Sequence, residues 1–350
     1  MTKPIRTFVI GLGQMGKSHA LAYAHNPAFE IIALANRTRV ALPEELRGFP
    51  FVESFEAGLA LKPDLVSINT YTDTHADLAI RAMEAGCHVF IEKPLAATIE
   101  EAHAVVETAK RLKKKLVIGY ILRHHPSWME FVRLARELGP PFVMRMNLNQ
   151  QSSGAAWEIH KRLMETTSPI VDCGVHYIDV MCQITDARPA QVRGMGVRLS
   201  GEIAEDQVNY GHLQVIFEDG SVGWYEAGWG PMISETAFFV KDVMSPKGCV
   251  SIVVAEGAQS ADVDTHTKTS TIKLHSAERD ASGAFAKPDQ LLSMADEPDH
   301  QDLCAREQAF VARAIAEDLD LNRHMDDALK SLQVTLLADQ SMREGRAIDL

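Results

Sequence analysis

Cysteine is scarce in this chain, and its spacing argues against two kinds of site. The 350 residues contain five cysteines, at positions 87, 173, 182, 249 and 304, with no C-x-x-C spacing among them. A disulfide framework needs paired cysteines and a structural zinc site needs clustered ones, so we expect neither. The pattern fits a reducing compartment, and we expect a cytoplasmic protein.

Long apolar runs and an excess of positive charge are also missing. No stretch approaches the roughly 20 apolar residues of a membrane-spanning helix, and the first apolar run leads straight into a glycine turn. The net charge of -12 disfavours a general nucleic-acid surface and binding to anionic membranes. Hydrophobic residues make up 46% of the chain, as in ordinary globular proteins, and 350 residues favour two domains.

The first third of the chain alternates short apolar runs with helical stretches. This pattern predicts βαβ units and a parallel sheet whose two faces are covered. The expected strands are Ile5–Gly11, Glu30–Ala35, Leu65–Thr70, His88–Glu92 and Lys115–Tyr120, and the expected helices are Met15–Asn26, His75–Ala85 and Glu100–Leu112.

The pattern changes after Tyr120, which predicts a first domain over 1–122 and a second over 123–350. Glu218–Gly220, between two apolar runs, is a hairpin signal. We expect residues 255–300 to be largely irregular. The expected helices are Pro126–Leu138, Ser168–Ile184, Asp302–Glu317 and Asp326–Glu344, and the expected strands are Val192–Leu199, Asn209–Phe217, Ser221–Trp229, Thr236–Val243, Cys249–Val254 and Thr269–Leu274.

A glycine-rich turn follows the first apolar run. Gly11, Gly13 and Gly16 fit the pattern G-x-G-x-x-G, with Gln14 and Met15 between the last two glycines. In such a turn the first glycine allows the tight bend, the second lets the backbone approach a pyrophosphate, and the third lets the helix pack on the strand. Because the turn follows a strand and opens a helix near the N-terminus, it predicts dinucleotide binding.

The end of the second expected strand bears on the choice between NAD and NADP. An Asp or Glu at this point usually accepts hydrogen bonds from the adenosine ribose of NAD. This chain has Asn36, followed by Arg37, Thr38 and Arg39. An amide does not repel a 2′-phosphate and an arginine can pair with one, so the segment favours NADP over NAD.

Three segments carry a resemblance to a known family. They are Gly11–Ala20 (GLGQMGKSHA), Ala85–Ala96 (AGCHVFIEKPLA) and Asp172–Asp179 (DCGVHYID). Together they resemble the glucose–fructose oxidoreductase, inositol dehydrogenase and rhizopine-catabolism family, Gfo/Idh/MocA. The resemblance covers nearly the whole chain.

The resemblance implies a Rossmann domain followed by a domain built on a large, mostly antiparallel open sheet. It implies a nicotinamide cofactor, no metal, and sugars or polyols as substrates. It also implies homodimers or homotetramers that pack through that sheet. In the family the lysine equivalent to Lys93 contacts the substrate and the nicotinamide ribose, and the Lys–Pro bond is often cis.

Asp172 and His176 are the candidates for proton transfer. They stand four residues apart, so on one continuous helix their side chains share a face. Ser168 and Pro169 predict the start of that helix, as cap and first position. A histidine titrates near neutrality and suits the role of general base, with Asp172 orienting it or, by the resemblance, contacting substrate. Asp179, three residues further, is a weaker candidate for the same cluster.

Lys93 is the candidate for polarising the reacting hydroxyl. It ends an apolar strand, and ligands of open α/β sheets bind beyond the carboxyl ends of the strands. An ammonium there could stabilise a developing alkoxide. The resemblance places Thr70, His75 and Glu92 near the cofactor as well, although Thr70–Thr72 departs from the family's usual T-P-N.

Further candidates are the basic and aromatic residues after the first domain. By the resemblance, Arg123, His124 and His125 lie near the nicotinamide, and Trp157, His160 and Lys161 belong to a segment that reaches the substrate. Such a cluster would suit a carboxylated or phosphorylated sugar. The alternative is a solvated basic loop.

The expected function is an NAD(P)-dependent oxidoreductase that acts on a secondary hydroxyl of a sugar, sugar acid or polyol. Two alternatives remain open. One is a redox-assisted glycosidase on the same fold, which reduces no cofactor in net terms. The other is a non-catalytic sensor, which the presence of Lys93, Asp172 and His176 together disfavours.

Overall fold

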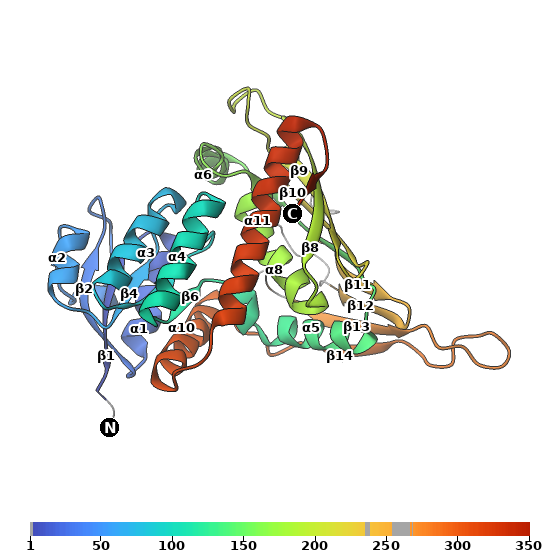
Figure 1. Ribbon diagram of the computed structural model, residues 1–350, viewed down its shortest axis with the longest axis horizontal. Helices are drawn as coiled ribbons and strands as arrows, with labels where there is room; N and C mark the ends of the chain where they lie inside the picture. Colours follow the sequence, from blue (N-terminus) through green and yellow to red (C-terminus); the bar gives the residue numbers. More distant parts are fainter. Residues whose placement is uncertain (1–2, 235–238, 254–266, 268) are drawn as a thin grey trace. The chain divides into compact units, whose positions relative to one another are not determined.

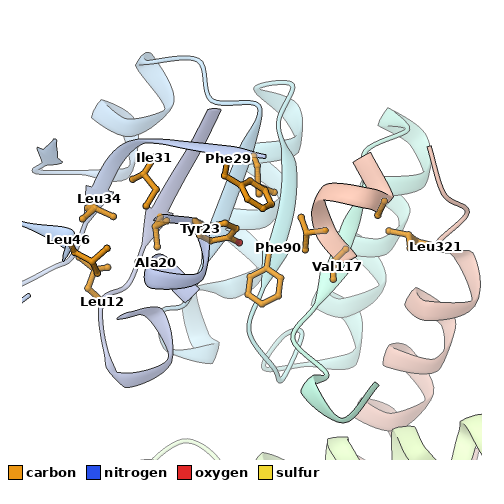
Figure 2. Packing of buried hydrophobic residues seen from close by; sticks show 14 residues of the cluster. Leu12, Ala20, Tyr23, Phe29, Ile31, Leu34, Leu46, Phe90, Val117 and Leu321 are labelled. Carbon is orange, nitrogen blue, oxygen red and sulfur yellow. The ribbon is translucent and has the colours of Figure 1, made fainter. Parts of the chain in front are cut away.

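The computed structural model describes residues 3–234, 239–253, 267 and 269–350. The chain divides into two compact units, Met1–Ile121 with Pro298–Leu329, and Leu122–Glu297 with Lys330–Leu350 (Figure 1). We expected all residues after 122 to belong to the second domain, whereas Pro298–Leu329 belongs to the first unit. Hydrophobic burial explains this return, because Val311, Ala314 and Leu321 are buried in the core of the first unit (Figure 2).

The first unit is a six-stranded parallel sheet in the order β3-β2-β1-β4-β5-β6. With the usual right-handed crossovers, α1 lies on one face of the sheet and α2, α3 and α4 on the other. Helix α10 packs beside α1. This confirms the Rossmann domain. Its elements are β1 (Ile5–Ile10), α1 (Gln14–His25), β2 (Phe29–Ala35), β3 (Phe51–Val52), α2 (Phe55–Ala60), β4 (Leu65–Ile68), α3 (His75–Glu84), β5 (His88–Ile91), α4 (Ile99–Leu112), β6 (Leu116–Ile118) and α10 (His300–Ala316).

Four neighbouring strands of this sheet end level with one another. The register pairs Ile10 with Ile68, Ile68 with Ile91 and Ile91 with Ile118. The hydrogen bonds between strands continue for one more residue. The amide of Asn69 donates to the carbonyl of Ile10, that of Glu92 to Ile68 and that of Gly119 to Ile91, at 2.8–2.9 Å. Gly11, Asn69, Glu92 and Gly119 therefore share the carboxyl edge of the sheet, where open α/β folds bind their ligands.

The second unit contains a nine-stranded sheet in the order β14-β13-β12-β11-β7-β10-β9-β8-β15. Only β7 and β10 run parallel among its paired strands in the described residues, so the sheet is mixed and mostly antiparallel, as expected. Its elements are α5 (Pro126–Leu138), β7 (Val143–Gln151), α6 (Gly154–Met164), α7 (Pro169–Asp172), α8 (Gly174–Thr185), β8 (Pro189–Val197), β9 (Tyr210–Phe217), β10 (Val222–Gly230), β11 (Lys241–Ser245), β12 (Gly248–Val253), β13 (Thr271–Ser276), β14 (Gln290–Ser293) and β15 (Ile348–Asp349). Helix α11 (Asn322–Glu344) contributes residues to both units.

Several sequence predictions differ from the structure in this unit. The helix expected over Ser168–Ile184 is interrupted at Cys173, which separates α7 from α8. Strand β7 and helix α6 were not predicted, because the buried and exposed residues of β7 do not alternate cleanly. Part of the strand expected over Thr236–Val243, the last residue of Cys249–Val254, and most of 255–268 lie outside the described residues. The hairpin at Glu218–Gly220 is confirmed, since it joins antiparallel β9 and β10.

None of the helices in the described part of the chain is both long enough and apolar enough to span a membrane.

His88, the histidine of the AGCHV segment, has a structural role in the first unit. Its Nδ1 atom accepts a hydrogen bond from the backbone amide of Lys115 at 3.0 Å, which ties the start of β5 to the start of β6. Burial, with the charges of Lys114 and Lys115, lowers the pKa of His88 from 6.5 to about 4. The folded protein therefore needs this imidazole neutral.

We predict that His88 makes the free energy of unfolding depend on pH. Between pH 6.5 and 4 the unfolded chain binds a proton that the folded His88 does not, so stability falls as the pH falls through this window. In His88→Asn the amide oxygen keeps an acceptor but does not titrate, so urea unfolding across the window should show a shallower loss of stability. Equal slopes for the two proteins would contradict this role for His88.

Candidate functional site

The glycine turn has the geometry that the pattern predicts. Gly11 has φ +85°, and a Cβ atom there would lie 2.3 Å from the carbonyl oxygen of Asn69. A Cβ atom on Gly16 would lie 1.9 Å from the carbonyl oxygen of Gly11. Both positions therefore require glycine for packing within the protein. At Gly13, in contrast, a Cβ atom would meet nothing within 4 Å, so this glycine leaves space on the outer side of the turn.

The N-terminus of α1 is open at the same place. Gly13 is its N-cap residue, no side chain caps the helix, and its first turn contains no acidic residue. Gln14 is exposed and Met15 is half-buried. A helix start with unpaired amides, a positive dipole end and open space beside it suits the pyrophosphate of a dinucleotide, so these residues fit that group.

Asn36 at the end of β2 supports the glycine turn directly. Its Oδ1 atom accepts a hydrogen bond from the amide of Leu12 at 2.8 Å, and its Nδ2 atom donates to the carbonyl of Thr38 at 2.8 Å. Arg37, Thr38 and Arg39 are exposed beside it. This strand end therefore presents two guanidinium groups and no carboxylate.

Thr70 and His75 lie beyond the end of β4, and the structure gives them different surroundings. The Thr70 hydroxyl lies 2.7 Å from that of Thr74. His75 is 1% exposed, with Nδ1 2.7 Å from the carbonyl oxygen of Pro94 and Nε2 3.1 Å from that of Thr70. Burial lowers the pKa of His75. His75 is thus a buried link between two loops rather than an exposed contact.

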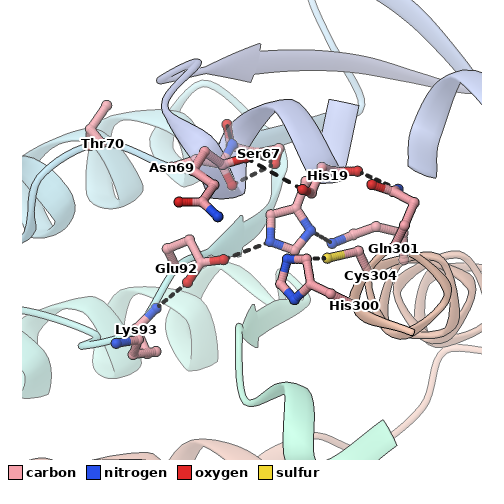
Figure 3. Close-up of polar contacts among 12 residues, drawn as sticks. His19, Ser67, Asn69, Thr70, Glu92, Lys93, His300, Gln301 and Cys304 are labelled. Atoms are coloured by element: carbon pink, nitrogen blue, oxygen red, sulfur yellow. Dashed lines mark hydrogen bonds and ion pairs between the residues drawn. The ribbon is translucent and has the colours of Figure 1, made fainter. Parts of the chain in front are cut away.

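Glu92 and Lys93 follow β5 at the shared carboxyl edge. Glu92 is 7% exposed, and its Oε1 atom lies 2.6 Å from Nε2 of the buried His19 (Figure 3). Its Oε2 atom accepts a hydrogen bond from the backbone amide of Lys93 at 3.2 Å. Lys93 is half-buried, and the Lys93–Pro94 peptide is cis, as the resemblance implied.

In the second unit Asp172 and His176 lie on either side of the helix interruption. Ser168 caps α7 by accepting a hydrogen bond from the amide of Val171, and Pro169 is its first residue, as predicted. Asp172 ends α7 and His176 lies in the first turn of α8, and Cys173 between them keeps a right-handed helical backbone. Both side chains are half-buried, and the Cys173 thiol donates to Asp172 Oδ2 at 3.5 Å.

Arg123 is engaged by a carboxylate of its own unit. Its Nε and Nη2 atoms donate to the two oxygens of Asp179 at 2.8 and 2.6 Å, and Asp179 is 1% exposed. Asp179, considered above for the cluster of Asp172 and His176, is therefore the buried partner of Arg123. His125 is fully buried and caps α5 by accepting from the amide of Ser127.

Trp157, His160 and Lys161 lie on α6, in three different settings. Trp157 is buried, whereas Lys161 is paired with Glu158 at 2.8 Å and with Glu202 at 3.0 Å. The ring of His160 stacks on that of Trp229, with centroids 4.5 Å apart and planes 13° apart.

Trp229 continues this cluster toward Asp172. Its indole donates to Gln150 Oε1 at 2.8 Å, and Cys173 Sγ lies 3.9 Å from the same oxygen. His160, Trp229, Gln150, Cys173 and Asp172 are thus connected through consecutive contacts. The sequence predicted His160 and Asp172 but missed Trp229 and Gln150, which lie on strands β10 and β7 and carry no motif.

His19 and Gln308 were also missed by sequence reasoning. His19 falls inside the GLGQMGKSHA segment, so its position was marked but its role was not. Gln308 comes from α10, almost three hundred residues later, and its Nε2 atom lies 2.9 Å from His19 Nδ1. In the described residues no three His, Cys, Asp or Glu side chains gather as ligands for a metal ion.

Two family models match the chain, one in each half. Residues 5–120 match the model described as "Oxidoreductase family, NAD-binding Rossmann fold". Residues 133–236 match the model described as "GFO/IDH/MocA C-terminal domain". Together the two matches cover nearly all of the first expected domain and a little under half of the second.

Curated relatives match over about half of their own length. The UDP-N-acetylglucosamine 3-dehydrogenase of Acidithiobacillus ferrooxidans is 34% identical over 196 residues, which cover 55% of this chain and 58% of the relative. The D-glucoside 3-dehydrogenase of Escherichia coli is 29% identical over 189 residues, which cover 51% of this chain and 53% of the relative.

A solved structure extends the likeness of fold over the whole chain. The scyllo-inositol dehydrogenase of Lactobacillus casei, with bound NAD(H) and scyllo-inositol, has a TM-score of 0.74. Its identity is 20%, and the match covers 99% of each chain. The fold, the glycine turn and both family models agree, and the chain belongs to the Gfo/Idh/MocA oxidoreductase family.

Proposed function

We propose that this protein is an NAD(P)-dependent dehydrogenase acting on a secondary hydroxyl of a sugar, sugar acid or polyol. The observation that carries the proposal is the shared carboxyl edge of the first unit. At this edge Gly13, with open space beside it, follows β1, and Lys93 follows β5. A pyrophosphate seat and a cation on the same edge suit a dinucleotide with a reacting hydroxyl beside it.

The chemistry requires one proton and one hydride to leave the substrate. A nicotinamide bound at the glycine turn would supply the acceptor for the hydride of the carbinol carbon. His176 accepts the hydroxyl proton, so that the C–O bond becomes a carbonyl. The Lys93 ammonium donates a hydrogen bond to the same oxygen and stabilises the negative charge that develops there. Asp172 orients the imidazole or holds a neighbouring hydroxyl.

The surroundings of the basic residues favour an uncharged sugar ring over an anionic one. Arg123 is committed to Asp179, and Lys161 to Glu158 and Glu202, so these cations are already neutralised. The stacked rings of His160 and Trp229, next to the carboxamide of Gln150, suit the hydroxyls and C–H faces of a sugar. These surroundings are also compatible with a substrate whose charged group lies outside the reacting ring, as in a nucleotide sugar.

We predict reduction of the dinucleotide by one class of compound and its loss in His176→Ala. Purified protein would be mixed with NAD+ or NADP+ and a panel of sugars, sugar acids, inositols and UDP-sugars, and the reduced band followed at about 340 nm. Without the base, kcat should fall by at least about a hundredfold. His103→Ala, on the exposed face of α4, is the matched control and should keep wild-type turnover.

Near-wild-type turnover in His176→Ala would defeat the assignment of the base. A flat trace for every compound, with release of an aglycone from glycosides, would replace the dehydrogenase by the redox-assisted glycosidase. A flat trace with neither reaction, while the dinucleotide still binds, would favour the sensor.

We propose NADP as the preferred cofactor. Asn36 has both ends of its amide bonded within the protein, and no carboxylate follows β2. Arg37 and Arg39 are exposed at this point, and a guanidinium pairs well with a 2′-phosphate.

We predict that Arg37→Ala lowers kcat/KM for NADP+ by about tenfold, as expected for the loss of one charge-assisted hydrogen bond. The value for NAD+ should change by less than about twofold, because NAD lacks the 2′-phosphate. Arg111→Ala, an exposed arginine on α4, should change neither value. Wild-type efficiency with NAD+ equal to or above that with NADP+ would contradict the preference.

We propose that a second copy of the chain packs on the nine-stranded sheet. Val143, Val222 and Ile216 are 40%, 38% and 44% exposed, and the register places them side by side on β7, β10 and β9. Met195 and Val197 on β8 are also exposed. A contiguous exposed apolar row on a sheet face is typical of an interface between copies.

We predict a mass of two or four times 38.6 kDa for the wild-type protein by light scattering after size-exclusion chromatography. Ile216→Asp places a charge in the apolar row and should shift the protein toward the single-chain mass. Leu61→Asp, an exposed leucine of the first unit, is the control and should leave the mass unchanged. A wild-type monomer would contradict the interface.

A further inference from the structure

The peptide on the N-terminal side of Lys93 is held by a buried carboxylate. Glu92 Oε2 accepts the hydrogen bond from the Lys93 amide at 3.2 Å, and Glu92 Oε1 lies 2.6 Å from His19 Nε2. Gly119, level with Glu92 on the neighbouring strand, leaves room for this side chain. A Cβ atom on Gly119 would lie 3.3 Å from Oε2 and 3.4 Å from Cδ. The carboxylate therefore sits in a close-fitting slot between two donors.

The tautomer of His19 follows from its contact with Gln308. Gln308 Nε2 lies 2.9 Å from His19 Nδ1, and a carboxamide nitrogen can only donate. Nδ1 is therefore an acceptor, and Nε2 carries the hydrogen that His19 donates to Glu92. His19 is fully buried, with its ring 4.7 Å from that of Phe90, so the imidazole has little freedom to turn. Nearby, Gln301 donates to the carbonyl of Ser18 at 2.9 Å and fastens α10 to α1.

The peptide that follows Pro94 is held by a second buried histidine. His75 Nδ1 lies 2.7 Å from the carbonyl oxygen of Pro94. Of the two backbone carbonyl oxygens that the His75 ring faces, that of Pro94 is the nearer, since that of Thr70 lies 3.1 Å from Nε2. Two backbone groups are thus fixed: Glu92, supported by His19 of α1, holds the amide of Lys93, and His75 of α3 holds the carbonyl of Pro94.

We propose that His19, Glu92, Gln308 and His75 are positioning residues that clamp the Lys93–Pro94 turn and so set the direction of the Lys93 side chain. This inference rests on the proposed function, in which the Lys93 ammonium stabilises charge on the reacting oxygen. A polarising group works only within a narrow range of position, and small displacements lower the rate strongly. The clamp gives a flexible lysine side chain a rigid base.

The clamp explains why a glutamate precedes the lysine. An ionised carboxylate offers two acceptor oxygens, which the amide of Lys93 and the imidazole of His19 both require. A carboxamide of the same shape offers one. Glu92→Gln must therefore turn its NH2 group toward one of the two donors, although it fills the same slot.

The test compares Glu92→Gln with Glu100→Gln, which makes the same change at an exposed position on α4. In Glu92→Gln kcat should fall by about tenfold, as for one lost hydrogen bond to a charged group. The KM for the dinucleotide should change by less than about twofold, since the glycine turn is untouched. Glu100→Gln should match the wild-type protein in both.

Hydrogen exchange followed by mass spectrometry gives a readout that needs no activity. The amides of Lys93, Leu95 and Ala96 should exchange faster in Glu92→Gln, while those of α1 and α4 keep their wild-type rates. His75→Leu, which removes the second arm of the clamp, should show the same local change. Unchanged exchange at 93–96 would overturn the proposal, and so would faster exchange across the whole first unit, because that result indicates a general loss of stability.

Lys93→Ala, assayed in parallel, separates this inference from the proposed function. Wild-type turnover in Lys93→Ala would contradict the role given to Lys93. The exchange rates at residues 93–96 in Glu92→Gln would still decide whether the clamp exists.

Discussion

The structure of the candidate site depends on one constraint, the level carboxyl edge of the parallel sheet. Ile10, Ile68, Ile91 and Ile118 are paired in register across four neighbouring strands. The last carbonyls of the first three accept hydrogen bonds from the residue that follows the next strand of the sheet. Whatever follows these isoleucines must therefore lie at the same level. A glycine turn, a pair of loops and the Glu92–Lys93 step are brought together by sheet pairing, before any side chain contributes.

Buried polar side chains then fix what the sheet brings together. His19 and His75 are both buried. His19 bonds the carboxylate of Glu92, which holds the Lys93 amide, and His75 bonds the carbonyl of Pro94. Buried polar groups are costly unless they are bonded, so such pairs hold their partners in one arrangement. In the second unit a buried carboxylate holds its partner in the same way, since Asp179 accepts two hydrogen bonds from Arg123. There the residues that sequence alone presents as cations for a substrate are instead committed to carboxylates.

The sequence was sufficient for local features and insufficient for partners distant along the chain. Gly11 and Gly16 could be predicted because steric requirements within one turn set the pattern, and the Rossmann strands because each is a continuous apolar run. Gln308 could not be predicted as the partner of His19, since nothing local in α10 marks its return to the first unit. Strand β7 was missed because its buried positions do not alternate, although it pairs with β10 at the centre of the second sheet. The roles of Arg123 and Lys161 were obscured for the same reason, because their carboxylate partners are distant in sequence.

The central claim is that the glycine turn, Lys93, Asp172 and His176 serve one reaction. A crystal structure of the protein with bound NADP tests it most directly. The account predicts the pyrophosphate over Gly13 at the start of α1, and the nicotinamide ring in contact with a space that Lys93 Nζ and the His176 imidazole both reach. It would be contradicted by a nicotinamide that lies away from Lys93, or by an Asp172 and His176 that face a different cavity from the one the ring occupies.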